Sequence, residues 1–175
     1  MNHLDPKQFI NQVFISELET LSIKNHYISF AIIAIGIEFL GKCLDKEAKD
    51  WNIPNRARKN FSHAIDSLVA FEKYRSIKDV LYEDLRCGFA HSFVPGSRLT
   101  LSSKNETENL IKTDERINIR CEDFYQDFKK ACQEVIEMEF ANDDKMSNAL
   151  ISIPGAKFND IVESDNAITE SFKRD

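Results

Sequence analysis

The chain has few of the residues that build phosphate loops or disulfide frameworks. Of its 175 residues, 5 are glycine and 4 are cysteine. The glycines are scattered and match neither G-x-x-x-x-G-K nor G-x-G-x-x-G, so a backbone cradle for phosphates is not expected. The cysteines, Cys43, Cys87, Cys121 and Cys132, include no C-x-x-C pair. We therefore expect free thiols in a reducing compartment.

Metal-binding patterns are lacking as well. The sequence has no H-E-x-x-H motif and no EF-hand loop. Cys87 and His91 stand four residues apart, a spacing that lets two side chains reach one metal ion. No second cysteine/histidine pair exists to complete a tetrahedral site. The sequence therefore predicts neither a metal site nor another cofactor.

An excess of basic charge and a membrane-length apolar run are also missing. The formal net charge is −6, which argues against a general nucleic-acid binder but leaves room for a local basic patch. The most apolar stretch, Tyr27 to Leu40, has 14 residues and contains Glu38. It is too short to span a bilayer and predicts a buried core helix without membrane contact. The first residues lack the pattern of a signal peptide, so we expect a cytoplasmic location.

Apolar residues, 42% of the chain and including 13 phenylalanines, are sufficient for one core. Their spacing predicts an all-α (mainly) protein, a bundle of four to five helices. The first expected helix begins at Asp5-Pro6, and the second spans about 27–49. The third has an apolar face over 61–71. The fourth runs from about 76 to 93, and the last covers 121–140. The helical domain would therefore occupy residues 1–140. Residues 141–175 hold four basic and seven acidic residues and read as an acidic, flexible tail.

A short region before the last helix changes to a period of two. Leu99 and Leu101 alternate with polar residues, and so do Ile117 and Ile119. This alternation is typical of β-strands, and 109–113 is a candidate for a third one. We expect a small antiparallel hairpin or meander inserted at about 97–121.

The stretch LRCGFAHSFVPG, residues 85–96, places Arg86 and His91 near the end of the fourth helix. Histidine accepts and returns protons near neutral pH, and arginine presents a fork of donors to phosphate oxygens. On an ideal α-helix the two are about 140° and 7.5 Å apart, so one helix does not easily close them on a small substrate. Either the helix ends at His91, which lets the histidine bend back, or two copies meet at a two-fold axis, where Gly88 would permit close approach.

The segment Arg86-Cys-Gly-Phe-Ala-His91 resembles the R-x4-6-H signature of the HEPN (higher eukaryotes and prokaryotes nucleotide-binding) superfamily. The helical order and an apolar helix that carries a glutamate agree with it. The resemblance implies a helical-bundle homodimer with a composite site at its interface. It implies a metal-independent endoribonuclease with Arg86 and His91 as catalytic residues. Such enzymes are typical of toxins, which have antitoxin partners, and of phage defence.

Two alternatives to catalysis stay open. Catalytic members of the superfamily usually have Asn, Asp or His directly after the arginine, where this chain has Cys87. A non-catalytic helical dimer that binds a nucleotide, RNA or a protein partner would also fit the sequence. From spacing alone, Arg86 would pair with an acidic neighbour and His91 would cap the last helical turn.

Four further residues are candidates for supporting roles. Glu38, on a helix expected to be buried, needs a partner, and Arg86 is a good candidate; the alternative is a glutamate that reaches solvent. If the strand leucines and isoleucines face the core, then Arg98, Arg116 and Arg120 share the outer face. These arginines would form a basic wing for RNA phosphates, or simply a polar surface that resists aggregation.

Overall fold

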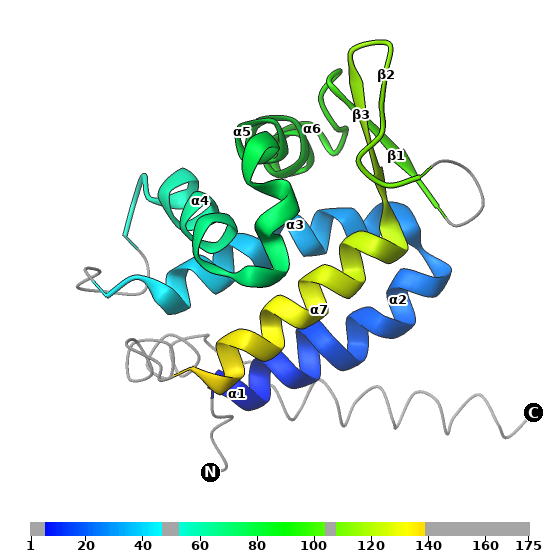
Figure 1. Ribbon diagram of the computed structural model, residues 1–175. Coiled ribbons are helices and arrows are strands. Elements are labelled where there is room, and N and C mark those ends of the chain that lie inside the picture. Colours follow the sequence, from blue (N-terminus) through cyan, green and yellow to red (C-terminus); the bar gives the residue numbers. More distant parts are fainter. Residues whose placement is uncertain (1–5, 47–52, 104–107, 139–175) are drawn as a thin grey trace, which may run out of the picture.

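Five helical segments surround one apolar core in the structure, a computed structural model that describes residues 6–46, 53–103 and 108–138 (Figure 1). The first segment joins α1 (Pro6–Phe9), a π-helical stretch (Ile10–Glu17) and α2 (Leu18–Lys24). Next come α3 (His26–Leu44) and α4 (Ala57–Ser67). A 3-10 stretch (Val69–Ile77) leads to the fourth, which joins α5 (Lys78–Val80), a π-helical stretch (Leu81–Cys87) and α6 (Gly88–Ser92). The last is α7 (Cys121–Glu137). The mainly helical fold expected from the sequence is confirmed.

Helix α3 forms the centre of the core, as its apolar composition predicts. Phe30, Ile33 and Ile37 are almost fully buried. Gly41 faces α4 so closely that a Cβ there would lie 1.8 Å from the Asn60 carbonyl oxygen. A larger residue would push the two helices apart. By length and composition α3 is also long and apolar enough to cross a membrane. However, 61% of its most apolar stretch is buried within the fold.

The helix boundaries differ from the expected ones where side chains far along the chain intervene. The apolar face predicted over 61–71 is divided, because Leu68 takes an extended conformation after α4. The carboxylate of Glu134 on α7 then accepts the backbone N–H groups of Val69 and Ala70 at 2.8 and 2.7 Å. These bonds start a new helical stretch that sequence periodicity does not reveal. Helix α3 ends at Leu44 rather than near 49, and residues 47–52 lie outside the described ranges.

A small mixed sheet precedes α7 and is formed by β1 (Leu99–Ser102), β2 (Lys112–Thr113) and β3 (Arg116–Arg120) in the order β1-β3-β2. Strands β2 and β3 are antiparallel, but β1 and β3 are parallel. The expected all-antiparallel arrangement is therefore wrong for β1. The expected alternation also holds only in part, because Asn118 and Ser102 are buried while Leu101 and Ile117 are only partly buried. The direction of β1 follows from the long connection between residues 103 and 115, which suits a parallel crossover.

The predicted acidic tail, residues 141–175, falls outside the described part of the chain.

Candidate functional site

Arg86 lies on a π-helical stretch, where backbone bonds join residues five apart. This geometry brings Tyr82 and Cys87 close together, which an α-helix would not do. Burial raises the pKa of Tyr82, and the neighbouring Cys87 adds to the effect. The α-helical angle used to relate Arg86 to His91 therefore does not apply here. Isolated π-helical turns are rare and frequent at functional sites.

The guanidinium of Arg86 is held by Glu38 of α3. Arg86 Nε lies 2.8 Å from Glu38 Oε2, and Nη2 lies 2.6 Å from the same oxygen. The pairing of the buried glutamate with Arg86 is thus confirmed. Partial burial lowers the pKa of Arg86, but the charge and hydrogen bond of Glu38 outweigh it and leave the pKa raised. The arginine is fully charged and fixed in direction.

Lys42, one turn after Glu38 on α3, adds a second cation to the site. Its Nζ lies 3.8 Å from Glu38 Oε1, so one carboxylate lies between a lysine and an arginine. The three side chains carry a net charge of about +1 at neutral pH. Such a group attracts an anion such as a phosphate. The i, i+4 spacing of Glu38 and Lys42 in the sequence is typical of an ion pair on one helix, so this contact could have been predicted.

His91, on α6, is exposed and makes no hydrogen bond or ion pair with any residue of the described ranges. The alternative that His91 caps the helix does not hold. Phe93 in the left-handed conformation (φ 58°) and the Ser92 hydroxyl, which donates to the Gly88 carbonyl at 2.8 Å, close the helix instead. The imidazole is therefore available to a partner from outside the chain.

Within one chain the structure does not bring Arg86 and His91 into contact. Arg86 turns toward Glu38, whereas His91 faces solvent. The room left by Gly88 is taken by its own chain, because a Cβ there would lie 2.6 Å from the Val94 carbonyl oxygen. The glycine lets the residues after α6 fold back against the helix. A site that uses both side chains needs a second copy or a substrate that bridges them.

An exposed apolar patch, defined here as Tyr27, Ile28, Ile35, Phe93 and Val94, lies on α3 and on the residues after α6. Tyr27 donates a hydrogen bond to the Phe93 carbonyl at 2.8 Å, and the two ring centroids are 6.0 Å apart. Ile35 and Val94 are 52% and 58% exposed. Exposed apolar side chains often mark a protein interface, and among these residues Tyr27 and Phe93 are in direct contact.

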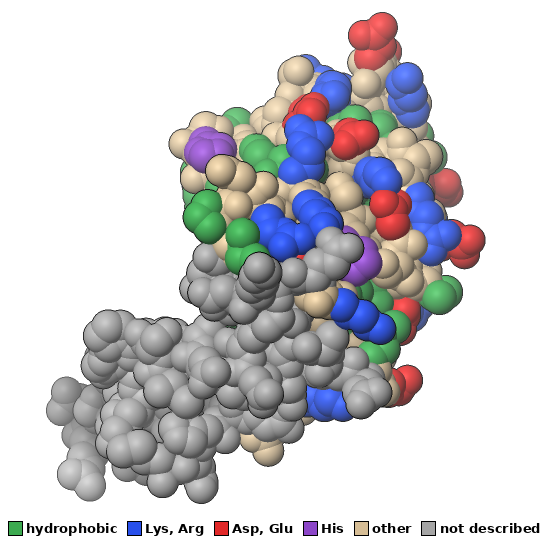
Figure 2. Space-filling model, turned by 90° about the vertical axis from the view of Figure 1, so that its left-hand side faces the viewer, with side chains coloured by type: hydrophobic (Ala, Val, Ile, Leu, Met, Phe, Trp, Pro, Cys, Tyr) green, Lys and Arg blue, Asp and Glu red, His purple; other side chains and the backbone are tan. Residues whose placement is uncertain are grey.

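Basic side chains gather in the middle of the face that carries α4 (Figure 2). Arg58 of α4 pairs with Asp79 and Glu83, and its guanidinium carbon lies 4.7 Å from the centroid of the Tyr82 ring. The corresponding distance from Arg86 is 6.0 Å. Tyr82 therefore contacts both arginines and joins this basic surface to Arg86. Sequence spacing does not reveal the position of Tyr82, since it depends on the π-helical turn.

Two of the three arginines assigned to a basic wing are bound by carboxylates. Arg98 bonds Glu83 at 2.7 Å and Asp84 at 3.0 Å. Arg120 pairs with Asp123, and Arg116 is exposed at the start of β3. Hydrogen bonding to Arg98 lowers the pKa of Asp84. These pairs offset most of the charge that a phosphate-binding wing would need.

No cluster of three or more histidine, cysteine, aspartate or glutamate side chains suited to a metal ion exists within residues 6–46, 53–103 and 108–138. Comparison with known proteins adds no relative: no protein-family model, curated protein or solved structure matches the chain. The function therefore has to be inferred from the residues of the site itself.

Proposed function

We propose that the protein is a metal-independent endoribonuclease of the HEPN type that acts in the cytoplasm as a homodimer. The observation that supports this proposal most directly is Arg86, fixed by Glu38 beside Lys42, with an exposed imidazole on the next helical turn. A fixed cation and a titratable base are the two groups that RNA cleavage without metal requires. A toxin, with an antitoxin partner, or a phage-defence protein is the setting that this activity suits.

In the proposed reaction, His91 takes the proton of a ribose 2′-hydroxyl. The 2′-oxygen then forms a bond to phosphorus while the bond from phosphorus to the 5′-oxygen breaks. The proton passes from His91 to the leaving 5′-oxygen, so the products are a 2′,3′-cyclic phosphate and a 5′-hydroxyl. Arg86 stabilises the negative charge that develops on the phosphate oxygens. Lys42 strengthens the attraction for the phosphate before the reaction.

Dimerisation would complete the site. The patch residue Ile35 precedes Glu38 by three residues on α3, and Phe93 follows His91 by two residues. Packing of this patch on the same patch of a second copy gives a two-fold interface and removes the exposed apolar surface from water. Two Arg86 and two His91 side chains would then line one groove.

The test is cleavage of end-labelled RNA in excess EDTA by the wild type, Arg86→Ala and His91→Ala. Loss of a catalytic histidine should reduce the rate by about 10²–10⁴-fold. The matched control is His26→Ala, which removes a histidine at the start of α3 whose imidazole lies 3.5 Å from the half-buried Glu122. Products with 2′,3′-cyclic phosphate ends support the proposal. Equal rates in the wild type and His91→Ala would refute it.

The second candidate is a non-catalytic helical dimer that binds a nucleotide, RNA or a protein. Cys87, which follows Arg86 and hydrogen-bonds Tyr82, favours it, because this position then lacks the polar side chain found in catalytic relatives of the HEPN type. RNA binding that needs Arg86, without any cleavage, would identify this function.

A further inference from the structure

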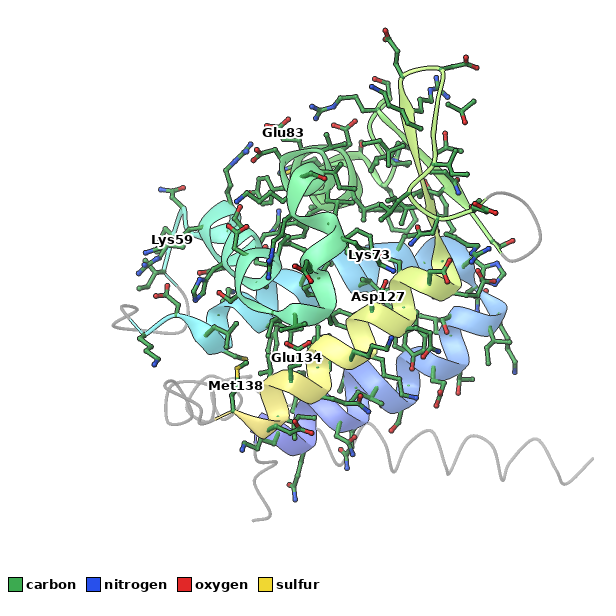
Figure 3. The ribbon with its side chains drawn as sticks, viewed as in Figure 1. Lys59, Lys73, Glu83, Asp127, Glu134 and Met138 are labelled. Carbon is green, nitrogen blue, oxygen red and sulfur yellow. The ribbon has the colours of Figure 1, made fainter. Side chains whose placement is uncertain are left out.

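A cavity of about 470 Å³ lies at the end of α3, away from the Arg86 site. Leu44 and Met138 contribute apolar surface to it, and Lys46, Lys59 and His63 contribute polar side chains. Figure 3 shows Lys59 on α4 and Met138 just beyond the end of α7. Helices from three parts of the chain therefore meet around one partly apolar space.

The described residues that line the cavity carry a net positive charge. Within this described lining, Asp45 is the one acidic residue, and its carboxylate pairs with Arg56 at 3.1 Å. The ring of His63 lies between the Leu44 carbonyl at 3.4 Å and the Ser67 hydroxyl at 3.3 Å. Lys46 and Lys59 are exposed at the rim. An occupant with an apolar group and negative charge fits these walls.

The chain itself supplies such a segment directly after Met138. The next residues are Glu139-Phe140-Ala141-Asn142-Asp143-Asp144, with one aromatic side chain and three carboxylates. Phe140 follows Met138 by two residues, which is at most about 7 Å of extended chain. The aromatic ring is thus within reach of the cavity that Met138 already lines. Asp143 and Asp144 follow Phe140 by three and four residues.

We propose that residues 139–144 dock in this cavity, with Phe140 against Leu44 and Met138 and with Asp143 and Asp144 against Lys46 and Lys59. A segment joined to its site by so short a connection has an effective concentration of the order of millimolar. A modest contact is therefore enough to keep it bound. The docking does not depend on the RNase activity proposed above.

Limited trypsin digestion of the full chain tests the docking. Trypsin cleaves after Lys145, next to the docked segment, and after Lys157, farther along. Each initial rate is divided by the rate at the same bond in a synthetic peptide of residues 139–175. Docking should slow cleavage after Lys145 by about tenfold or more, the effect of burying one phenylalanine, and leave cleavage after Lys157 unchanged. Equal normalised rates at the two bonds would overturn the proposal.

Matched variants separate docking from general effects. Phe140→Ala should abolish the protection at Lys145, whereas Phe172→Ala, the same change near the end of the chain, should preserve it. Reversal of the pocket charge in Lys46→Glu/Lys59→Glu should also reduce protection, and Lys24→Glu/Lys112→Glu, with the same net charge, should not. A similar loss in both lysine pairs, or with Phe172→Ala, would overturn the proposal and leave the cavity to another occupant.

Discussion

At the scale of residues, the site depends on one carboxylate. Glu38 is only 8% exposed and contacts both Arg86 and Lys42. A buried carboxylate between two cations is stabilised by both, and each cation is held in place in return. Glu38 therefore fixes the direction of the Arg86 guanidinium.

Removal of this charge should destabilise the fold. Glu38→Gln keeps the shape of the side chain but leaves Arg86 partly buried without a counter-charge. We expect the free energy of unfolding to fall by about 2 kcal/mol, as for hydrogen bonds to charged groups. Urea unfolding of the two proteins measures this difference in the free energy of unfolding. The control is Glu19→Gln, which breaks an exposed ion pair with Lys129 and should change stability by less than about 1 kcal/mol. Equal losses in the two variants would contradict the role of Glu38.

At the scale of elements, Asp84 joins the π-helical stretch to the sheet. Its carboxylate accepts the backbone N–H of Arg98 at 2.9 Å, and its backbone carbonyl accepts the N–H of Gly96 at 2.8 Å. A Cβ at Gly96 would lie 2.3 Å from the Asp84 carboxyl carbon, so the glycine permits this close packing. Sequence patterns did not reveal the contact, because it joins residues 12 to 14 apart that belong to no common period.

The Asp84–Arg98 contact predicts a pH dependence of stability. Hydrogen bonding to Arg98 lowers the pKa of Asp84 below its ordinary value of 3.8. The stabilisation is therefore fully present above that value and is lost as the pH falls through the lower pKa of the folded state. Arg98→Met should be less stable than the wild type at pH 7, and the difference should shrink below about pH 3.8. Urea unfolding between pH 2.5 and 7 measures this; a difference that stays constant with pH would contradict the prediction.

How much of the fold was predictable also varies by element. The apolar stripes of α3 and α7 predict buried helices from the sequence, because helical spacing is a property of nearby residues. The same spacing does not distinguish five-residue from four-residue hydrogen bonding, so the π-helical turn around Arg86 was missed. The pairing of Glu38 with Arg86 was predictable because a buried charge requires a partner. The parallel direction of β1 and the start of the 3-10 stretch at Glu134 depend on contacts between distant residues.

At the scale of the whole molecule, the described chain keeps the two candidate site residues, Arg86 and His91, apart. Arg86 and Lys42 supply positive charge at one place, and His91 faces solvent at another. The apolar patch lies beside them and is exposed in a single copy. Association through this patch would explain why so much apolar surface is left beside charged side chains.

A charge placed in the patch should prevent association. Ile35, 52% exposed on α3, would lie in the interface, so Ile35→Lys should weaken dimerisation by about tenfold or more because a lysine would have to be desolvated. Val69→Lys is the control, since Val69 is 71% exposed after α4 and outside the patch. Sedimentation velocity at several concentrations measures the association. A monomeric wild type, or equal dimerisation of Ile35→Lys, would refute the interface, and RNA cleavage should fall together with the dimer.

The two hydrogen bonds that Asp84 accepts from the Gly96 and Arg98 N–H groups have a consequence for the His91 imidazole. His91 lies between two anchored points of the backbone: Arg86, tied to α3, and the turn at Gly96 and Arg98, tied to Asp84. With both ends of this short span fastened, the ring explores space mainly by rotation about its own two side-chain bonds. Little backbone entropy would then be left to lose if a ligand bound the ring, because the backbone part of the ordering cost is already met when the chain folds.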